Sequence, residues 1–346
     1  MGRDVTMRAV AERAGVSTKT VSNVVNGTGA FSPETERRVR AAIDELGYRI
    51  NLFARGLRSR RTDTIALSLP NLYQPFYAEL AEQLIRAPEA QGLKVVLETT
   101  RGDAGRERAV LTGSRRELVD GVIYLPGALP PGDCMALPIA QPTVVVGEQP
   151  EEAAARGVDC VSIPNEDGAH AAVAHLLGQG RRRIAAIGER ADGPAGAQRL
   201  RGYRRALEEA GVPFDPSLVI AVDNPDQWAS GVGAATRLLR TRARFDALFC
   251  CTDVMAIGAL SALERSGVAV PDDIALAGFD DIEAAQYASP SLTTVDPHAG
   301  ALARTALSLL RARLGEDRSR TAPGQQASAG FTLRIRKSST TSPPTH

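Results

Sequence analysis

The apolar residues of the first 48 positions recur at intervals of three and four, which is the spacing of amphipathic helices. This spacing predicts helices over residues 7–14, 18–25 and 33–46. Their apolar face comprises Val10, Ala14, Val16, Val21, Val24, Val25, Val39, Ala42, Ile43 and Leu46. Thr6 and Ser17 can cap the first two helices, and Gly15 suits the turn between them because glycine tolerates a left-handed backbone. We expect a small three-helix domain.

From Thr64 onward the pattern changes to short apolar runs that alternate with helical segments. The strand candidates are 65–69, 95–98, 121–125, 143–146, 184–187, 218–222, 247–251, 274–278 and 331–337. Helices are expected near 76–90, 106–118, 167–177, 199–210, 228–239, 254–266 and 300–314. Strand–helix alternation predicts parallel sheets with helices on both faces. Nine strand candidates approach the largest number that one twisted sheet holds comfortably, which favours two lobes.

A short segment, N-L-F-A-R-G-L-R-S at residues 51–59, joins the two patterns. Nine residues are too few for a stable isolated helix, and Gly56 weakens a helix by about 1 kcal/mol relative to alanine. We expect coil that becomes helical only when a partner holds it. A disordered basic linker is the alternative interpretation.

Charge is distributed unevenly along the chain. Residues 1–61 contain 12 Lys and Arg against 6 Asp and Glu, whereas the whole chain has a formal net charge of only +1. A basic head on an acidic remainder suits a polyanionic partner for the head alone. The four cysteines lack C-x-x-C spacing and are interpreted as buried thiols. Without an apolar signal region or membrane-spanning run, the expected location is the cytoplasm.

The outward side chains of the second helix are Thr18, Lys19, Ser22 and Asn23, which suit base edges and phosphates. The stretch closely resembles the DNA-binding headpiece of the lactose/galactose repressor (LacI/GalR) family, whose pattern V-A-x-x-A-G-V-S-x-x-T-V-S-x-V-x-N-G is nearly complete. The resemblance implies that this helix enters the major groove, with base contacts from Thr18, Lys19 and Asn23. The last of these positions is often Arg in relatives. Further DNA contacts are expected at Thr6, Ser17, Thr20, Ser22, Asn26, Tyr48, Asn51, Ala54 and Leu57.

The resemblance extends over residues 4–337 and implies a domain organisation. A helix-turn-helix headpiece (1–49) and a hinge (50–62) precede an effector-binding and dimerisation domain (63–337). This domain is expected to be an α/β, two-lobed, periplasmic-binding-protein-like fold. Lobe 1 spans about 63–162 and 296–322, and lobe 2 spans about 163–293 and 328–337. The three crossovers are placed near 162–165, 293–297 and 321–329, and residues 338–346 are expected to form a disordered tail.

Polar residues follow several of the predicted strands, where open parallel sheets bind ligands. An Arg fork among carboxylates, with an aromatic face, suits a polyol or another small polar molecule. The resemblance places the effector site at Arg199, Asp253 and Asp280, and more loosely at Phe76, Tyr77, Glu148 and Trp228. Structural alternatives remain for two of these residues: an Arg–Asp pair for Arg199 and a turn cap for Asp280. The customary Asp of the first crossover is replaced by Pro164.

These features predict a transcriptional regulator, most simply a repressor that binds a palindromic double-stranded DNA operator. The effector is expected to be a sugar or sugar derivative. An activator and a nucleobase-responsive regulator are the alternatives. A homodimer is expected, with a tetramer as the alternative, and no cofactor, metal, catalytic residue or membrane is implied. An enzyme is disfavoured because no complete G-x-G-x-x-G, P-loop, H-E-x-x-H or G-x-S-x-G motif occurs. A secreted sugar-binding protein would require a signal peptide.

Overall fold

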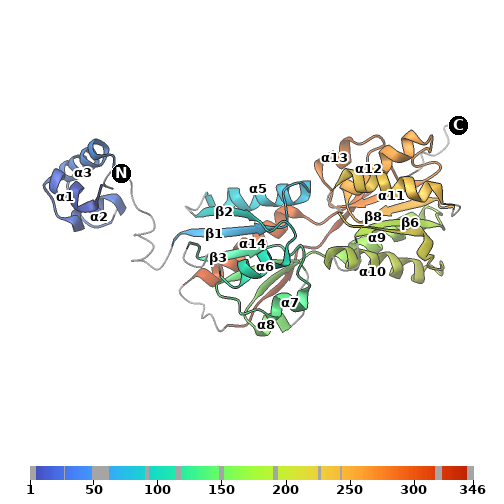
Figure 1. The fold of residues 1–346 in the computed structure, drawn as a ribbon, viewed down its shortest axis with the longest axis horizontal. Coiled ribbons are helices and arrows are strands. Elements are labelled where there is room, and N and C mark those ends of the chain that lie inside the picture. Colours follow the sequence, from blue (N-terminus) through green and yellow to red (C-terminus); the bar gives the residue numbers. More distant parts are fainter. Residues whose placement is uncertain are drawn as a thin grey trace. The chain divides into compact units, whose positions relative to one another are not determined.

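The computed structural model describes residues 5–26, 28–48, 62–89, 93–113, 118–147, 152–189, 194–224, 227–241, 244–315 and 322–340. The chain divides into two compact units, Met1–Thr62 and Asp63–His346 (Figure 1). We call them the headpiece and the body. Within the described part of the chain, no helix is both long enough and apolar enough to span a membrane.

The headpiece contains three helices, α1 (Met7–Ala14), α2 (Thr18–Asn26) and α3 (Pro33–Leu46). The hydroxyls of Thr6 and Ser17 accept hydrogen bonds from the amides of Ala9 (3.3 Å) and Thr20 (3.0 Å), so both predicted caps are formed. Gly15 ends α1 with φ +63°, a left-handed backbone that glycine adopts without strain. The predicted apolar face closes a small core of Val10, Ala11, Ala14, Val21, Val24, Val39 and Ala42.

The side chain of Arg38 fastens the turn between α1 and α2 to α3. Its guanidinium donates to the carbonyl of Ala14 and, at 3.2 Å, to that of Gly15. The carbonyls at a helix C-terminus lack intrahelical partners, so the cation satisfies them and suits the negative end of the helix dipole. The sequence pattern alone did not predict this contact.

The described residues of the body form two six-stranded sheets. The sheet of lobe 1 has the order β11 (Gln326–Ser328), β5 (Asp159–Ser162), β4 (Thr143–Val146), β3 (Gly121–Tyr124), β1 (Thr64–Leu69), β2 (Lys94–Thr99). The sheet of lobe 2 has the order β12 (Thr332–Arg334), β10 (Thr293–Asp296), β9 (Ala275–Phe279), β8 (Ala247–Cys250), β6 (Ile184–Glu189), β7 (Val219–Val222). All neighbouring strands are parallel except β12, which pairs antiparallel with β10 (Thr294 opposite Arg334).

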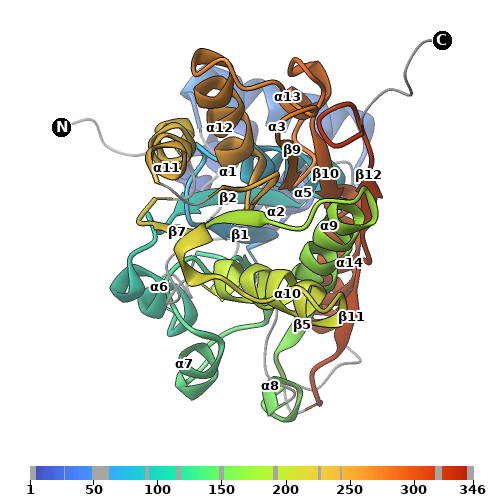
Figure 2. The ribbon, with the colours of Figure 1, turned by 90° about the vertical axis from the view of Figure 1, so that its right-hand side faces the viewer.

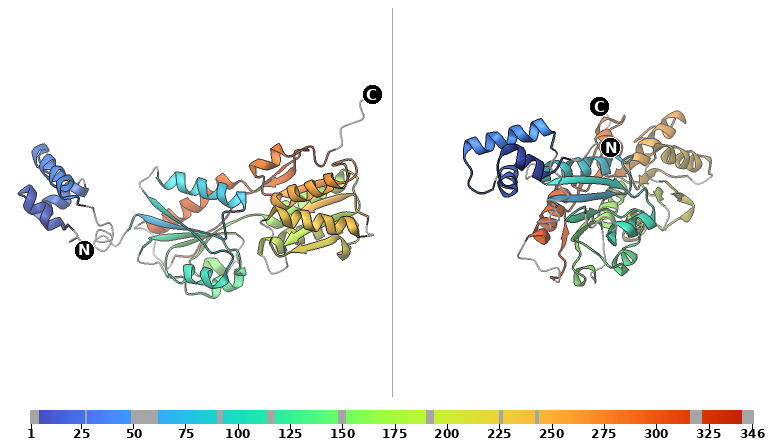
Figure 3. Two further views of the ribbon diagram at one scale, coloured as in Figure 1. Left: turned by 45° about the horizontal axis from the view of Figure 1, so that its top comes forward. Right: turned by 60° about the vertical axis from the view of Figure 1, so that its left-hand side comes forward.

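Helices cover both faces of each sheet, as strand–helix alternation predicted (Figures 2 and 3). The helices of lobe 1 are α5 (Pro75–Glu89), α6 (Ala104–Leu111), α7 (Pro131–Ala136), α8 (Glu152–Ala155) and α14 (Ala299–Leu314). Those of lobe 2 are α9 (Asn165–Gly178), α10 (Pro194–Glu209), the 3₁₀ turn η1 (Pro216–Leu218), α11 (Trp228–Arg240), α12 (Asp253–Arg265) and α13 (Glu283–Tyr287). In β1, Ile65 and Leu67 face one apolar core and Ala66 faces another. This alternation follows from the two-residue period of a strand.

Two glycines allow α11 and α12 to cross at close range. A Cβ on Gly231 would lie 2.1 Å from the carbonyl oxygen of Met255, and one on Gly258 would lie 2.2 Å from that of Trp228. We therefore expect Gly231→Ala to lower the free energy of unfolding by about 1–3 kcal/mol or more, because the helices must separate.

Gly233→Ala on the same helix is the matched control, because a Cβ there has no atom within 4 Å. Alanine should raise the free energy of unfolding there by up to about 1 kcal/mol through helix propensity. Urea denaturation followed by circular dichroism measures both variants. Equal effects at the two positions would contradict this account of the helix crossing.

The chain crosses between the lobes at three places, and the third differs from the prediction. The first crossover joins β5 to α9 at residues 163–164, and the second joins β10 to α14 at residues 297–298. The third lies at residues 329–331, because β11 still pairs with β5 in the sheet of lobe 1. The predicted end of lobe 1 at 322 was therefore too early. The last strand is also shorter than the predicted range 331–337.

The predicted disordered tail, 338–346, is wrong at its start. Ser338 and Ser339 are buried in the structure. The hydroxyl of Ser338 accepts from the amide of Thr293 (2.8 Å) and donates to the carbonyl of Leu276 (2.6 Å), so it connects two strands of lobe 2. The hydroxyl of Ser339 lies 2.8 Å from Nε2 of His175, whose pKa burial lowers. Residues 341–346 lie outside the described part of the chain.

Candidate DNA interface and effector cleft

The exposure of α2 separates a core face from an outward polar face. Val21 and Val24 are buried, whereas Thr18 and Lys19 are exposed. Among the other predicted DNA contacts, Thr6 and Ser17 are exposed, and Thr20, Ser22, Asn23 and Tyr48 are half-buried. The outward face therefore presents short hydroxyls and one cation, groups that can reach phosphates and base edges.

Some of the predicted DNA contacts also pack within the headpiece, and others lie outside the described residues. Asn23 packs beside the backbone of Gly29, where a Cβ would lie 2.8 Å from its Nδ2. Tyr48 packs against the headpiece core. Asn26 is the last residue of α2. The hinge residues Asn51, Ala54 and Leu57 lie outside the described residues.

A cleft of about 1020 Å³ opens at the carboxyl ends of strands in both lobes. Open parallel sheets bind ligands at this edge, where the polar residues that follow the predicted strands are expected to lie. The polar and aromatic residues that line the cleft are Asn71, Tyr73, Gln74, Phe76, Tyr77, Thr99, Arg101, Asn165, Gln198, Arg199, Asp223, Asn224, Gln227, Thr252 and Asp280. Amides and hydroxyls dominate this set, and the two Arg residues are matched in number by two Asp residues.

Arg199 lies in the floor of the cleft, where it is only 6% exposed. Its Nη2 is 3.1 Å from Oδ1 of Asp280, its Nε donates to Oδ1 of Asn165 at 2.9 Å, and its Nη1 donates to the carbonyl of Cys251. The guanidinium also lies 3.7 Å from the centre of the Phe279 ring. The structural alternative for Arg199, an Arg–Asp pair, is therefore present, and the pair lines the cleft.

Gln74 connects lobe 1 to this pair in lobe 2. Its Nε2 donates to Oδ2 of Asp280 at 2.7 Å, and its Oε1 accepts from the amide of Phe76 at 2.6 Å, which fixes the orientation of the amide. A second bond between the lobes runs from the amide of Glu283 to Oε1 of Glu79 at 3.2 Å. Burial raises the pKa of Glu79. Both bonds cross the contact between the lobes, and the bond between Gln74 and Asp280 joins two residues that line the cleft.

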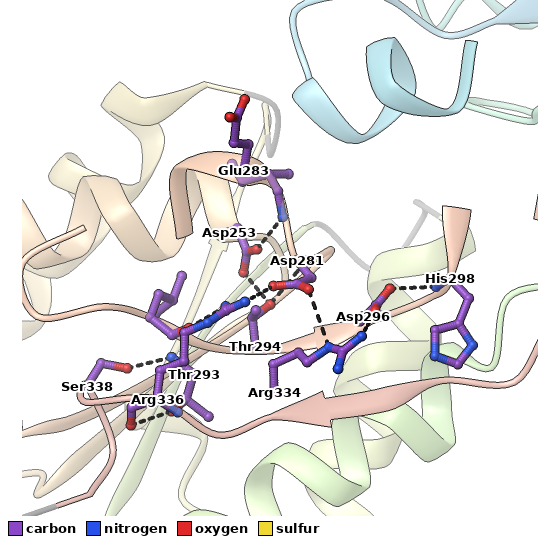
Figure 4. Close-up of polar contacts among 12 residues, drawn as sticks. Asp253, Asp281, Glu283, Thr293, Thr294, Asp296, His298, Arg334, Arg336 and Ser338 are labelled. Atoms are coloured by element: carbon purple, nitrogen blue, oxygen red, sulfur yellow. Dashed lines mark hydrogen bonds and ion pairs between the residues drawn. The ribbon is translucent and has the colours of Figure 1, made fainter. Parts of the chain in front are cut away.

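Asp253 does not line the cleft, so the predicted effector contact at this residue needs correction. The residue is wholly buried beneath the loop that follows β9 (Figure 4). Its Oδ1 accepts from the hydroxyl of Thr294 (2.6 Å) and its Oδ2 from the amide of Ile282 (3.0 Å). Asp253 therefore holds the loop that carries Asp280. The neighbouring Thr252 lines the cleft instead.

Burial raises the pKa of Asp253 well above its usual range, and the nearby Asp280 carboxylate raises it further. A raised pKa means that ionisation opposes folding, so this contribution to stability is complete at low pH and is lost as pH rises. We expect the free energy of unfolding of Asp253→Asn, relative to the original protein, to increase from pH 5 to pH 8. The slope is at most about 1.4 kcal/mol per pH unit.

Asp215→Asn is the control for this pH dependence. The Asp215 pKa is lowered by the hydroxyl and amide of Ser217, so its contribution is complete above the pKa of the unfolded chain. The difference in free energy of unfolding between Asp215→Asn and the original protein should be constant from pH 5 to pH 8. Urea denaturation at four pH values measures the free energy of unfolding of both variants, and a difference that stays constant with pH for Asp253→Asn would contradict the raised pKa of Asp253.

The remaining predicted effector residues have different positions. Phe76 and Tyr77 line the cleft from the first turn of α5, with ring centres 5.8 Å apart. Trp228 is 42% exposed and does not line the cleft, whereas the preceding Gln227 does. Glu148 lies outside the described residues. Asn165, directly after Pro164 in the first crossover, lines the cleft although the family's acid is missing there.

An ionic cluster that sequence reasoning missed lies where β10 and β12 pair (Figure 4). Arg336 is 2.6 Å from Asp281, and Arg334 is 2.8 Å from Asp296. The amide of His298, in the second crossover, donates to Asp296 at 2.8 Å. The cluster fixes the C-terminal strand beside the loop that holds Asp280. The residues described here include no group of side chains arranged to hold a metal ion.

Comparisons with known proteins assign both units. Residues 6–51 match bacterial regulatory proteins of the lacI family, and residues 173–339 match the periplasmic binding protein-like domain. The transcriptional regulator CelR of Thermobifida fusca is 38% identical over 90% of this chain and 92% of its own length. The chain belongs to the lacI family of bacterial regulatory proteins. DegA of Bacillus subtilis, another transcriptional regulator, is 35% identical over 84% of this chain and 86% of its own length.

Solved structures agree with this assignment. A complex of CelR with cellobiose has a TM-score of 0.70 at 35% identity and covers 96% of this chain and 99% of its own. The lac repressor dimer, bound to operator and the anti-inducer ONPF, has a TM-score of 0.82 at 24% identity over 97% of this chain and 99% of its own, which shows the shared fold. The predicted fold class and family are confirmed. The protein is a helix-turn-helix transcriptional regulator, and its relatives are regulators, not enzymes.

Proposed function

We propose that the protein is a repressor that binds a palindromic operator as a homodimer and is controlled by a neutral sugar in the cleft. The observation that carries this proposal is the Arg199–Asp280 pair in the floor of the cleft, which the amide of Gln74 joins to the opposite lobe. A ligand that uses Asp280 changes a contact between the lobes. The same chain carries a DNA-binding headpiece, so a change in the contact between the lobes can alter the affinity for DNA.

The DNA contacts follow from the exposed face of α2. We propose that Thr18, Lys19 and Asn23 reach base edges, and that the hydroxyls of Thr6, Ser17, Thr20 and Ser22 reach phosphates together with Asn26 and Tyr48. Two-fold symmetry of a dimer requires two half-sites of related sequence. In the hinge, Leu57 would insert into the minor groove, with Asn51 and Ala54 beside it.

The chemistry of the cleft favours an uncharged polyhydroxylated ligand. The charge of Arg199 is matched by that of Asp280, and the remaining polar lining consists largely of amides and hydroxyls that donate and accept hydrogen bonds. Phe76 and Tyr77 supply aromatic surface against which an apolar sugar face can pack. The relative CelR has been solved with cellobiose, so a neutral disaccharide is the first effector to test.

Coupling between the cleft and DNA would use the bonds between the lobes. A sugar hydroxyl that donates to Asp280 competes with the amide of Gln74, so sugar binding favours a different arrangement of the lobes. This change would bias the hinge segments of the dimer and alter operator affinity. The effector and the operator then affect each other's binding reciprocally.

The experiment combines a DNA selection with a sugar panel. Duplexes are selected from a random library, and the enriched site is titrated in the presence of glucose, cellobiose, maltose, glucose 6-phosphate, gluconate and hypoxanthine. Trp228 is the sole tryptophan of the chain and directly follows the cleft residue Gln227, so its fluorescence reports binding. We expect a palindromic site and a response to neutral sugars. A response confined to the charged compounds or to hypoxanthine would contradict the proposed effector class.

A further inference from the structure

A buried carboxylate on α6 lies behind the cleft wall of lobe 1. Glu107 is wholly buried, although it is an acid on a helix that covers one face of the sheet. Its Oε1 accepts from the amides of Gly127 (3.0 Å) and Ala128 (3.0 Å) and the hydroxyl of Thr100 (3.3 Å), and its Oε2 accepts from the hydroxyl of Tyr124 (2.6 Å) and the amide of Leu129 (2.9 Å).

These bonds converge on loops that line the cleft. Gly127 and Ala128 follow β3 and line the cleft themselves, and Thr100 follows β2 directly before the lining residue Arg101. The amide of Thr100 also donates to the carbonyl of Leu69, where β1 ends. One side chain therefore satisfies three consecutive amides of an irregular loop and links the segments that follow β2 and β3, the two strands on either side of β1.

The surroundings leave the loop little freedom to move. A Cβ on Gly127 would lie 2.8 Å from the Pro70 ring, which lines the cleft from the end of β1. Burial and the nearby Cys134 and Glu107 raise the pKa of Tyr124, so its hydroxyl keeps its proton and remains a donor. Amides that lose a buried acceptor must find another partner, which requires the loop to move.

We propose that Glu107 is a positioning residue of the effector cleft: it sets the affinity for the sugar by holding the loop at residues 126–129 in its binding conformation. This inference rests on the proposed effector function of the cleft. Glu107 does not line the cleft and acts only through the backbone that it holds. Glutamine at this position has the same shape, but it places an amide donor opposite backbone amide donors.

The test compares Glu107→Gln with two matched variants. Tyr124→Phe removes one donor and leaves the three backbone bonds intact. Asp159→Asn perturbs another wholly buried carboxylate of lobe 1, which pairs with Arg313 (2.6 Å) and accepts from the amide of Gln325 (2.6 Å) but does not line the cleft. All three variants are measured as full-length protein by thermal unfolding, amide hydrogen exchange and cellobiose titration with Trp228 fluorescence.

We expect exchange at Gly127, Ala128 and Leu129 to accelerate by about tenfold or more in Glu107→Gln only. Cellobiose binding should weaken by about tenfold in Glu107→Gln, and it should change little in Asp159→Asn even where the unfolding temperature falls equally. Unchanged exchange in Glu107→Gln, or equal loss of affinity in Glu107→Gln and Asp159→Asn, would overturn the inference. If the original protein does not bind cellobiose, the proposed effector is wrong. The hydrogen-exchange measurement then still tests whether Glu107 holds the loop.

Discussion

Replacing Arg199 with alanine is expected to lower the free energy of unfolding of the body by about 3–5 kcal/mol. The substitution leaves the buried Asp280 carboxylate without its cation, and it removes the bonds to Asn165 and to the Cys251 carbonyl. An uncompensated charge in a buried position costs far more than the net value of the pair. Urea denaturation of the full-length protein measures the change.

A double-mutant cycle separates the charge effect from the loss of packing. Asp280→Asn in the Arg199→Ala background removes the unpaired charge while keeping an oxygen for the amide of Gln74. The double variant should therefore be more stable than Arg199→Ala alone by more than 1 kcal/mol. If the effects of the two substitutions on the free energy of unfolding are additive, the Arg199–Asp280 pair does not stabilise the floor of the cleft.

Arg199→Lys tests the same residue in ligand binding without removing its charge. Lysine keeps the cation but cannot reproduce the planar fork that reaches Asp280, Asn165 and the Cys251 carbonyl together. We expect this variant to fold and to bind operator DNA in the absence of effector. Its response to the effector should be lost, and an unchanged response would remove Arg199 from the effector site.

The second large effect is the dependence of DNA affinity on salt concentration. The excess of six positive charges in residues 1–61 predicts that DNA binding displaces counterions from several phosphates. With six phosphate contacts, the affinity for the selected duplex should fall about a thousandfold between 50 and 200 mM KCl. Fluorescence anisotropy at four salt concentrations measures the slope. An affinity independent of salt would contradict binding by the basic headpiece.

The proposed role of α2 as the helix that reads the DNA sequence is tested in the same assay. Lys19→Ala should weaken binding to the selected duplex by about 1–3 kcal/mol and reduce discrimination against a mutated half-site. Arg40→Ala on α3 is the control, because this exposed cation pairs with Glu36 at 2.7 Å and lies outside the recognition helix. An equal loss of affinity for the selected duplex in both variants would indicate a general charge effect instead of sequence reading by α2.

The headpiece was predictable because its determinants are local. The caps at Thr6 and Ser17 and the turn at Gly15 act within a few residues, and the apolar spacing sets the packing. Many strands and helices of the body were predictable for the same reason, but β5, β10 and β11 lie at or beside the expected crossovers and were not predicted as strands. Its C-terminal end was not, because the burial of Ser338 depends on strands more than 40 residues earlier in the chain.

The cleft was predictable only in part, because residue type does not reveal which partners a side chain finds. Asp280 follows a predicted strand and Arg199 begins a predicted helix, and both line the cleft. Asp253 also follows a strand, but its carboxylate accepts a hydrogen bond from the hydroxyl of Thr294, 41 residues later in the chain. Gln74 and Glu107 gave no sequence signal, because a glutamine in a loop and a glutamate on a helix are common solvent-exposed residues.

The central claim is that a ligand in the cleft changes the affinity of the headpiece for DNA. It is tested most directly by measuring the affinity for the selected duplex with and without saturating cellobiose, in the original protein and in Arg199→Lys. We expect a change of about tenfold or more in the original protein and none in the variant. Cellobiose that binds, by Trp228 fluorescence, without changing DNA affinity would contradict the claim.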